Sequence, residues 1–240
     1  MRTPARLLLA AITLGGLLAP VSAAAAPPVV GGGRASQDYS FMAYLPGCTG
    51  TLIKDNWVVT AGHCPTPGTV RVGSIDRTQG GTVVGVRRAV SHPRIDVKLL
   101  ELAAPAPYAP APVPAESGAA GTVTRIIGWG QTCAAPGCGP VPRIANELDT
   151  TILADTRCSG IDGPHEICTS NPGNVAGACY GDSGGPQVRL IDDRWALIGV
   201  TSRAGTNSPV CGTGPSVYGD LPSIRPWLNT QVGGLPALAG

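Results

Sequence analysis

The sequence has little charge, and the two signs nearly balance. Acidic and basic residues make up 13% of the 240 residues, and the formal net charge is +2. Arg2 and Arg6 lie in the first 25 residues, which hold no acid, so the remainder carries 15 basic and 15 acidic residues. A neutral chain lacks the electrostatic footprint of nucleic-acid or anionic-membrane binding. We therefore expect neither nucleic acid nor a membrane as a partner.

Patterns for metal binding and membrane insertion are also missing. The sequence has three histidines, none at a zinc-type spacing, and no Cys-x-x-Cys pair, so we expect no metal and no cofactor. The apolar run at residues 7–18 is shorter than the roughly 20 residues that a membrane helix needs. A basic start before it and small residues at 21–23 after it predict a signal peptide over residues 1–25. We expect a secreted, extracellular protein with a short propeptide at residues 26–28.

Glycine, proline and cysteine are plentiful by contrast, with 34, 24 and 8 residues. Frequent glycine and proline divide the chain into short elements and disfavour long helices. Eight cysteines in an exported chain indicate disulfides, although their spacing alone leaves the pairing open.

Short apolar runs between turn residues predict an all-β fold, an antiparallel sandwich or barrel. The runs lie at residues 51–53, 57–60, 82–90, 97–102, 123–127, 148–153, 195–200 and 215–218. Residues 103–114 hold five prolines and are typical of an extended connection between two halves. A short helix is expected within residues 221–232, with Pro222 near its start. Residues 233–240 are expected to form a loose tail.

Ser183 stands among four glycines in residues 177–186, GACYGDSGGP. Glycine allows positive φ and close approach of the backbone, so this loop can expose the serine hydroxyl and direct neighbouring N–H groups toward one point. Acyl transfer needs that combination, together with a base beside the serine. The plain alternative is a glycine-rich surface loop.

His63 is the best candidate for the base. It follows the apolar run 57–60 and precedes Cys64, whose disulfide would fix its position. His92 and His165 lie in irregular polar stretches and are expected to be exposed and inert. A structural histidine is the alternative interpretation of His63.

An imidazole base needs a carboxylate to orient it, and Asp96 fits best because it precedes the apolar run 97–102. A turn acid at the start of a strand is the alternative for Asp96. Acids in more polar surroundings are expected to be solvated; these are Asp76, Asp149, Asp192 and Asp193.

Three stretches, in chain order, resemble the signatures of the chymotrypsin/trypsin-like serine proteases. They are TAGHC at residues 60–64, DVKLL at residues 96–100 and GDSGGP at residues 181–186. The resemblance, to a secreted bacterial-type member, covers residues 29–232 as a peptidase domain. It implies two six-stranded antiparallel Greek-key β-barrels, with a boundary near residues 103–121 and a short C-terminal helix.

The resemblance also implies an activity, the hydrolysis of peptide bonds in protein or peptide substrates. Ser183 would be the nucleophile, His63 the general base and then acid, and Asp96 the residue that orients His63. The N–H groups of Gly181 and Ser183 would form the oxyanion hole. A catalytically inactive, protease-like binding protein is the alternative, although all three catalytic residue types are present.

Four residues match family positions that bind substrate: Gly177, Ser202, Ala204 and Ser216. Gly177 stands at the pocket base, where trypsin-type members have an aspartate. With no charge there, and with Ala204 and Ser216 in place of glycines, we expect a small or medium uncharged residue at P1, the residue before the cleaved bond. Ser202 would donate a hydrogen bond to the catalytic carboxylate. Arg203 follows it where the family has an aromatic residue.

Val29-Val30-Gly31-Gly32 resembles the N-terminus that is created when such zymogens are cleaved. The free amine of Val29 would then form an ion pair with Asp182. Pro28, and not an arginine or lysine, precedes Val29, which departs from the family pattern.

The resemblance further implies three disulfides: Cys48–Cys64, Cys158–Cys168 and Cys179–Cys211. Cys133 and Cys138 remain and can close a small loop on each other. A monomer is expected, with proteinaceous inhibitors as further partners.

Overall fold

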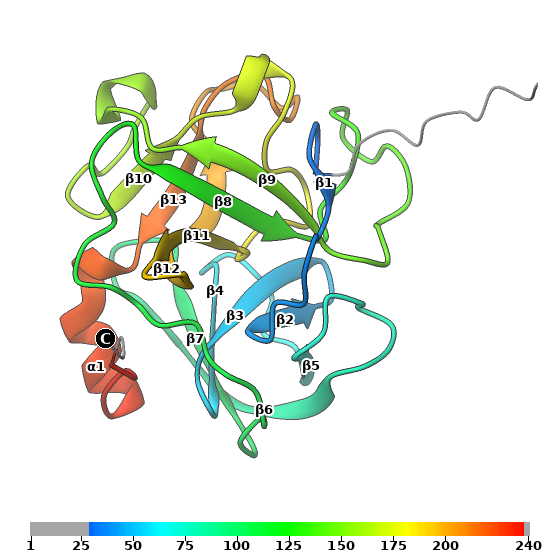
Figure 1. Cartoon of the computed structure of the whole chain (residues 1–240), viewed down its shortest axis with the longest axis vertical. Coiled ribbons are helices and arrows are strands. Elements are labelled where there is room, and N and C mark those ends of the chain that lie inside the picture. Colours follow the sequence, from blue (N-terminus) through cyan, green and yellow to red (C-terminus); the bar gives the residue numbers. More distant parts are fainter. Residues whose placement is uncertain (1–28, 238–240) are drawn as a thin grey trace, which may run out of the picture.

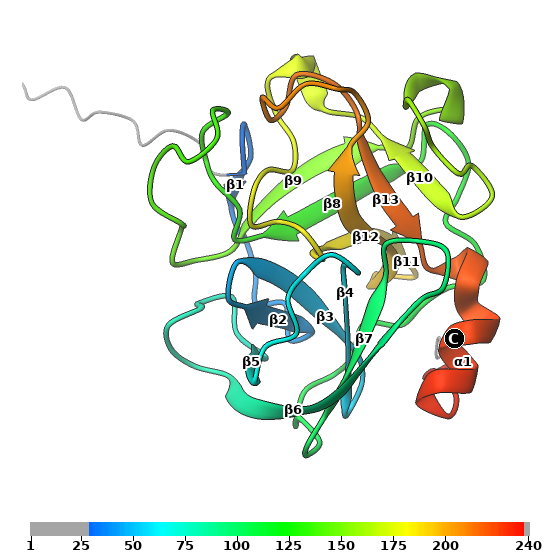
Figure 2. The same cartoon turned by 180° about the vertical axis from the view of Figure 1, so that it is seen from behind.

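Two antiparallel β-sheets form the framework of the protein, one from the first half of the chain and one from the second half together with a short strand at residues 33–34. The computed structural model describes residues 29–237, so the predicted signal peptide and propeptide fall outside the described residues. In Figure 1 the sheet from the first half lies below the sheet from the second half, and the C-terminal helix lies along one side. Figure 2 shows the same arrangement from behind.

The first sheet is a closed barrel with the strand order β2-β3-β4-β7-β6-β5. Its strands are β2 Met42–Leu45, β3 Cys48–Lys54, β4 Trp57–Thr60, β5 Thr69–Val72, β6 Thr82–Ser91 and β7 Lys98–Leu102. Leu52, Val58, Leu99 and Leu100 are 0% exposed. Burial of these apolar side chains stabilises this half and gives β4 and β7 a fixed register.

The second sheet has the strand order β1-β9-β8-β11-β12-β13-β10. Its strands are β1 Gly33–Arg34, β8 Val123–Gly128, β9 Asn146–Thr151, β10 Glu166–Thr169, β11 Pro186–Ile191, β12 Arg194–Ala204 and β13 Ser216–Asp220. Two 3₁₀ turns, η1 Asp155–Arg157 and η2 Pro172–Asn174, lie in the connections.

The expected all-β fold with a short C-terminal helix is confirmed, but the second half is a seven-stranded sheet and not the closed six-stranded barrel that was expected. The two-residue strand β1 adds a seventh strand at the edge of β9, where Gly33 pairs with Glu147. An isolated bridge between Ile152 and Thr169 joins the chain after β9 to β10. The six longer strands therefore approach closure at this bridge, and β1 lies outside the ring.

The helix α1 Arg225–Val232 follows the 3₁₀ turn η3 Pro222–Ile224, and a proline stands near the start of each. Leu228 is completely buried in the main hydrophobic cluster. Lys54 from β3 donates to the carbonyl of Val232 at 2.7 Å, at the helix end where a cation is favourable. No helix in the described part of the chain is long and apolar enough to cross a membrane.

The residues just after α1 still pack against the rest of the protein. Leu235 packs against the hydrophobic core, and its N–H donates to the side chain of Asn229 at 2.9 Å. Residues 238–240 lie outside the described residues.

Four disulfides close loops in both halves, and they are the pairs expected above. They join Cys48 to Cys64, Cys133 to Cys138, Cys158 to Cys168 and Cys179 to Cys211. The first ties β3 to the turn after β4, and the last ties together two loops of the second half.

Asp76, expected to be solvated, is instead 7% exposed. Its carboxylate accepts hydrogen bonds from Arg143 at 2.8 Å and from Thr78 at 2.7 Å. These donors, Arg143 above all, hold the pKa of Asp76 well below its ordinary value. Arg143 is 67 residues away in the sequence, so local polarity gave the wrong prediction. The other acids of that group are exposed; these are Asp149, Asp192 and Asp193.

Candidate active site

His63 lies in the turn after β4, and Asp96 lies just before β7, the strand that pairs with β4. The Asp96 carboxylate contacts this turn twice. Oδ1 accepts the backbone N–H of His63 at 2.8 Å, and Oδ2 lies 2.7 Å from Nδ1 of the ring. The His63 side chain is 48% exposed and that of Asp96 is 24% exposed. The carboxylate therefore holds an accessible imidazole by one of its nitrogens.

The residues around His63 explain why the ring lies here. A Cβ at Gly62 would lie 2.9 Å from Oδ1 of Asp96, so any larger residue would push the carboxylate away. Cys64, on the other side of His63, is bonded to Cys48 of β3. A glycine before the histidine and a disulfide after it thus set the position of the turn.

The contact between the two groups shifts the pKa of both. The hydrogen bond to Asp96 raises the pKa of His63 above its ordinary value, while burial and the charge of Lys98 act against the rise. Burial acts to raise the pKa of Asp96, but hydrogen bonds from His63 and Ser202 outweigh it and bring that pKa below its ordinary value. An ionised carboxylate beside an imidazole that can accept a proton is suited to general base catalysis.

Ser202, near the end of β12, is the third member of this contact chain. Its hydroxyl donates to Oδ2 of Asp96 at 2.7 Å, across 106 residues of sequence. The carboxylate thus receives one partner from each half of the molecule.

Ser183 lies on the loop before β11, and its backbone is anchored to the first barrel. Its carbonyl accepts the N–H of Thr49 at 2.8 Å and lies 3.7 Å from Sγ of Cys64, the neighbour of His63. Gly184 has φ +81°, and a Cβ there would collide with the carbonyl of Thr49, so the close approach requires glycine. In the described part of the chain, no hydrogen bond joins Oγ of Ser183 to the imidazole, and such contacts are often long in unliganded sites.

Two backbone donors flank Asp182 on the same loop. Among residues 29–237, no hydrogen bond uses the N–H of Gly181 or of Ser183, whereas the N–H of Asp182 donates to the carbonyl of Cys179 at 2.9 Å. The carbonyl of Gly181 accepts from Oγ1 of Thr49 at 3.0 Å, which holds the loop to the barrel. Unused N–H groups two residues apart can bind a developing oxyanion.

The Asp182 side chain is buried, at 3% exposed, and it helps to hold this loop. Its carboxylate accepts the N–H of Gly130 at 2.7 Å and that of Cys179 at 2.9 Å. Burial raises the pKa of Asp182 to about 6. Val29 is 1% exposed and lines the same small cavity as Asp182.

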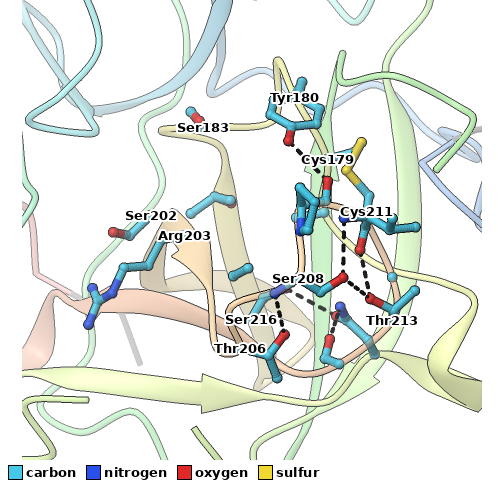
Figure 3. A pocket seen from close by; sticks show the side chains of 18 residues that line it. Cys179, Tyr180, Ser183, Ser202, Arg203, Thr206, Ser208, Cys211, Thr213 and Ser216 are labelled. Atoms are coloured by element: carbon cyan, nitrogen blue, oxygen red, sulfur yellow. Dashed lines mark hydrogen bonds between the residues drawn. A yellow bond between two sulfur atoms is a disulfide. The ribbon is translucent and has the colours of Figure 1, made fainter. Parts of the chain in front are cut away.

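A cavity of about 170 Å³ opens beside Ser183. Three of the four expected substrate-binding residues line it: Ser202, Ala204 and Ser216. Gly177, the fourth, is not among the lining residues. Figure 3 shows Ser183 at one end of the cavity and Ser216 at the other.

Asn171 lines the cavity next to Gly177, the residue expected to form its base, and the sequence did not predict this role. A Cβ on Gly177 would collide with the Asn171 amide, so the glycine makes room for this side chain. Asn171 is 7% exposed; its amide donates to the carbonyl of Gly214, and its oxygen accepts from Ser216 at 3.3 Å. These partners lie 43 and 45 residues further along the chain, so no local pattern marks Asn171.

Tyr180 and Arg203 shape the rim of the cavity. The Tyr180 hydroxyl donates to the carbonyl of Pro209 at 3.0 Å, which connects the serine loop to the loop before β13. Arg203 donates twice to Glu166, at 2.5 and 2.8 Å, and Glu166 is 6% exposed. Figure 3 shows the Arg203 side chain directed away from the interior of the cavity.

The other two histidines are half-buried rather than exposed as expected. The His92 ring packs edge-on against Trp227, with 4.8 Å between the ring centres. His165 lies 3.4 Å from the carboxylate of Asp162. Trp227, which is remote in sequence, therefore covers part of the His92 ring, whereas the acidic neighbour of His165 lies only three residues before it.

A closed β-barrel and a second β-sheet, with a serine, an imidazole and a carboxylate brought to the region where they meet, define a serine protease of the chymotrypsin type. Comparison with known protein families agrees, because the family model described as Trypsin matches residues 30–228. The chain belongs to the trypsin family.

Proposed function

We propose that the protein is a secreted serine endopeptidase that cleaves peptide bonds through an acyl-enzyme. The observation that carries this proposal is the contact chain from Ser202 to Asp96 to His63, with 2.7 Å at each step. It provides an oriented base beside the loop that carries Ser183, which is what a serine needs to become a nucleophile. The predicted signal peptide and the four disulfides fit an extracellular protein.

In the proposed reaction, His63 takes the proton of Ser183 as Oγ attacks the scissile carbonyl carbon. The N–H groups of Gly181 and Ser183 bind the oxyanion that forms. His63 then gives the proton to the leaving amine as the C–N bond breaks, and the acyl group stays on Ser183. Water gives a proton to His63 and attacks the ester, and the acid is released as Ser183 regains its proton. Asp96 stays ionised and stabilises the imidazolium.

The cavity supports cleavage after small or medium uncharged residues. Asn171 and Ser216 offer neutral hydrogen-bonding groups at its inner end, and Ala204 adds a methyl group to its lining. A cationic P1 side chain would lose its hydration there and gain no opposite charge. The preference among uncharged residues should be broad, because one methylene in such a pocket is worth only about 1–3 kcal/mol.

Full activity, in this proposal, requires removal of residues 1–28. The free amine of Val29 would form an ion pair with Asp182 in the cavity that both residues line, and would keep the buried carboxylate ionised. Because Pro28 precedes the cut, the activating protease is not expected to be one that cleaves after arginine or lysine. The active form is expected to be a monomer that proteinaceous inhibitors can block.

Labelling with a fluorophosphonate tests the catalytic proposal. Mass spectrometry of the treated, processed protein should find the reagent on Ser183, with peptidase activity lost in proportion to labelling. Ser183→Ala should abolish both signals, whereas Ser208→Ala, another serine of the cavity lining, should retain both. Absence of labelling, with no peptidase activity on any peptide, would favour the inactive binding protein instead.

A further inference from the structure

Lys98 is a buried cation close to the proposed catalytic histidine. The sequence contains two lysines, Lys54 and Lys98, against 15 arginines. Lys98 is the first residue of β7 and is 9% exposed. Among residues 29–237, no carboxylate forms an ion pair with it. Burying an ammonium without a counter-ion costs free energy unless other groups form hydrogen bonds with it. The contacts of Lys98 therefore show what stabilises its charge.

The Lys98 ammonium donates to the carbonyl oxygen of Cys64. Two residues earlier, the Asp96 carboxylate accepts the N–H of His63 at 2.8 Å. Two residues of one short segment at the start of β7 therefore bind the backbone of the turn that carries His63, called here the histidine turn. Asp96 accepts the N–H of His63, and Lys98 donates to the carbonyl of the next residue, Cys64.

The backbone of Lys98 is itself fixed by the barrel. It pairs with Thr60 of β4 on one side and with Ser91 of β6 on the other. Lys98 thus has a set position relative to the end of β4, from which the histidine turn begins.

The Lys98 charge also acts on the imidazole. Asp96 favours the protonated ring, whereas burial and the ammonium favour the neutral ring. The remaining groups on this side are the Ser202 hydroxyl, which contacts Asp96, and the Arg203 guanidinium, whose charge reaches Asp96. The Arg203 side chain is 41% exposed and paired with Glu166, so Lys98 is the buried cation of this group.

We propose that Lys98 is a positioning residue of this site: its buried ammonium fixes the Cys64 carbonyl, and with it the turn that carries His63. The positive charge held beside this turn also opposes protonation of the His63 ring. The ring then stays neutral, and able to accept a proton, at lower pH than Asp96 alone would allow. This role deepens the proposed peptidase function and rests on it, and it extends cleavage of peptides into the acid range.

Three substitutions separate the hydrogen bond from the charge. Lys98→Met removes both, Lys98→Gln keeps a donor without charge, and Lys98→Arg keeps the charge. Lys54→Met is the matched control because it removes the other lysine, whose ammonium bonds the carbonyl of Val232.

The quantity to measure is the pH midpoint of the His63 ring titration, followed by NMR in a Ser183→Ala background and assigned with His63→Ala. Lys98→Met and Lys98→Gln should both move the midpoint to higher pH, and Lys98→Arg and Lys54→Met should leave it in place. In the active enzyme, the two neutral variants should lower kcat/KM on the acid limb by about threefold or more relative to the plateau.

An unchanged midpoint in Lys98→Gln would overturn the proposal, because that variant keeps a donor and loses only the charge. If Lys98→Met fails to fold, the comparison of Lys98→Gln with Lys98→Arg decides the question. The ring titration does not need activity. A shifted midpoint in a protein that cleaves no peptide would therefore refute the proposed function while supporting the electrostatic role of Lys98.

Discussion

The hydroxyl of Ser202 lies 2.7 Å from Oδ2 of Asp96, the oxygen that also lies 2.7 Å from the His63 ring. One carboxylate oxygen thus connects β12 of the second sheet to the histidine turn of the barrel. The alignment of the two halves and the orientation of the imidazole depend on the same few atoms.

Ser202→Ala should lower kcat and leave KM nearly unchanged. A hydrogen bond to a charged group contributes about 1.5–3 kcal/mol, so we expect kcat to fall about tenfold or more. Steady-state kinetics with a peptide substrate measure the effect. Ser223→Ala is the control, because it removes an exposed hydroxyl that bonds the carbonyl of Asp220. A Ser202→Ala enzyme with the kcat of the parent would contradict the shared role of this oxygen.

The buried Asp182 predicts a pH dependence of stability for the unprocessed chain. Its pKa of about 6 in the folded state lies above the ordinary value of 3.8, so the folded protein binds this proton more tightly than the unfolded chain. The resulting stability is fully present below about pH 4 and is lost as the pH rises to about 6. The loss is at most about 3 kcal/mol.

Processing should change that dependence. In a chain that begins at Val29, the free amine would favour the ionised carboxylate of Asp182, so the loss between about pH 4 and pH 6 should disappear or reverse. Urea unfolding of Ser183→Ala proteins with and without residues 26–28 measures the difference, and Asp182→Asn should abolish it. Identical pH dependence in the two forms would argue against the ion pair.

Gly130→Ala should inactivate the enzyme by displacing Asp182. A Cβ at Gly130 would collide with the Asp182 carboxylate, whereas a Cβ at Gly68 would meet nothing within 4 Å. Loss of an ordered oxyanion loop should lower kcat by about 10²-fold or more. Gly68→Ala should keep the activity of the parent. Equal activity of the two variants would mean that the position of Asp182 is not critical.

Asn171→Asp should move the P1 preference toward lysine and arginine. It places a carboxylate at the inner end of the cavity, where a cationic P1 side chain would find an opposite charge. We expect kcat/KM for such substrates to rise about tenfold or more. A panel of chromogenic peptides that differ at P1 measures the change. Asn174 is exposed and lies outside the cavity lining, so Asn174→Asp should leave the P1 preference unaltered. An equal shift in that variant would mean that the added negative charge, and not its place in the cavity, changes the preference.

Asp76→Asn should lower the melting temperature near neutral pH and matter less in acid. The pKa of Asp76 is held below its ordinary value by Arg143, so its contribution to stability is present above pH 3.8 and is lost as the pH falls. The difference in melting temperature between Asp76→Asn and the parent should therefore be smaller below about pH 3 than near neutral pH, which thermal unfolding at the two pH values measures. Asp193→Asn, in the exposed turn between β11 and β12, should show little difference at either pH.

Much of the site could be predicted from the sequence because its loops depend on near neighbours. Gly62 and Cys64 fix His63, and Gly184 lets Ser183 approach the barrel. Two strands of the first barrel were also predictable from apolar runs: β4 matches residues 57–60, and β7 lies within residues 97–102, although Lys98 and Glu101 interrupt that run. β10 and β11 escape prediction, because their sequences mix apolar residues with the buried polar side chains Glu166 and Gln187.

Residues whose partners are distant in sequence could not be predicted in the same way. Asn171, Asp76 and Lys98 are polar and buried, and each is compensated by a group at least 34 residues away. A sequence pattern shows that a side chain can form hydrogen bonds, but not which remote group will provide them. Local sequence patterns therefore do not mark these three side chains as buried, because their partners come close only in the folded protein.

Val30 forms an isolated bridge with Gly177, whose N–H donates to the Val30 carbonyl at 2.8 Å. Val29 and Val30 would be the first residues of the proposed mature chain, and Val30 thus supports the loop that carries Ser183. An aminopeptidase that removed Val29 and Val30 would remove this support. It would thereby inactivate the enzyme without altering a catalytic residue. If the protein is secreted and processed as proposed, its working lifetime would then depend on how well this N-terminus resists exopeptidases.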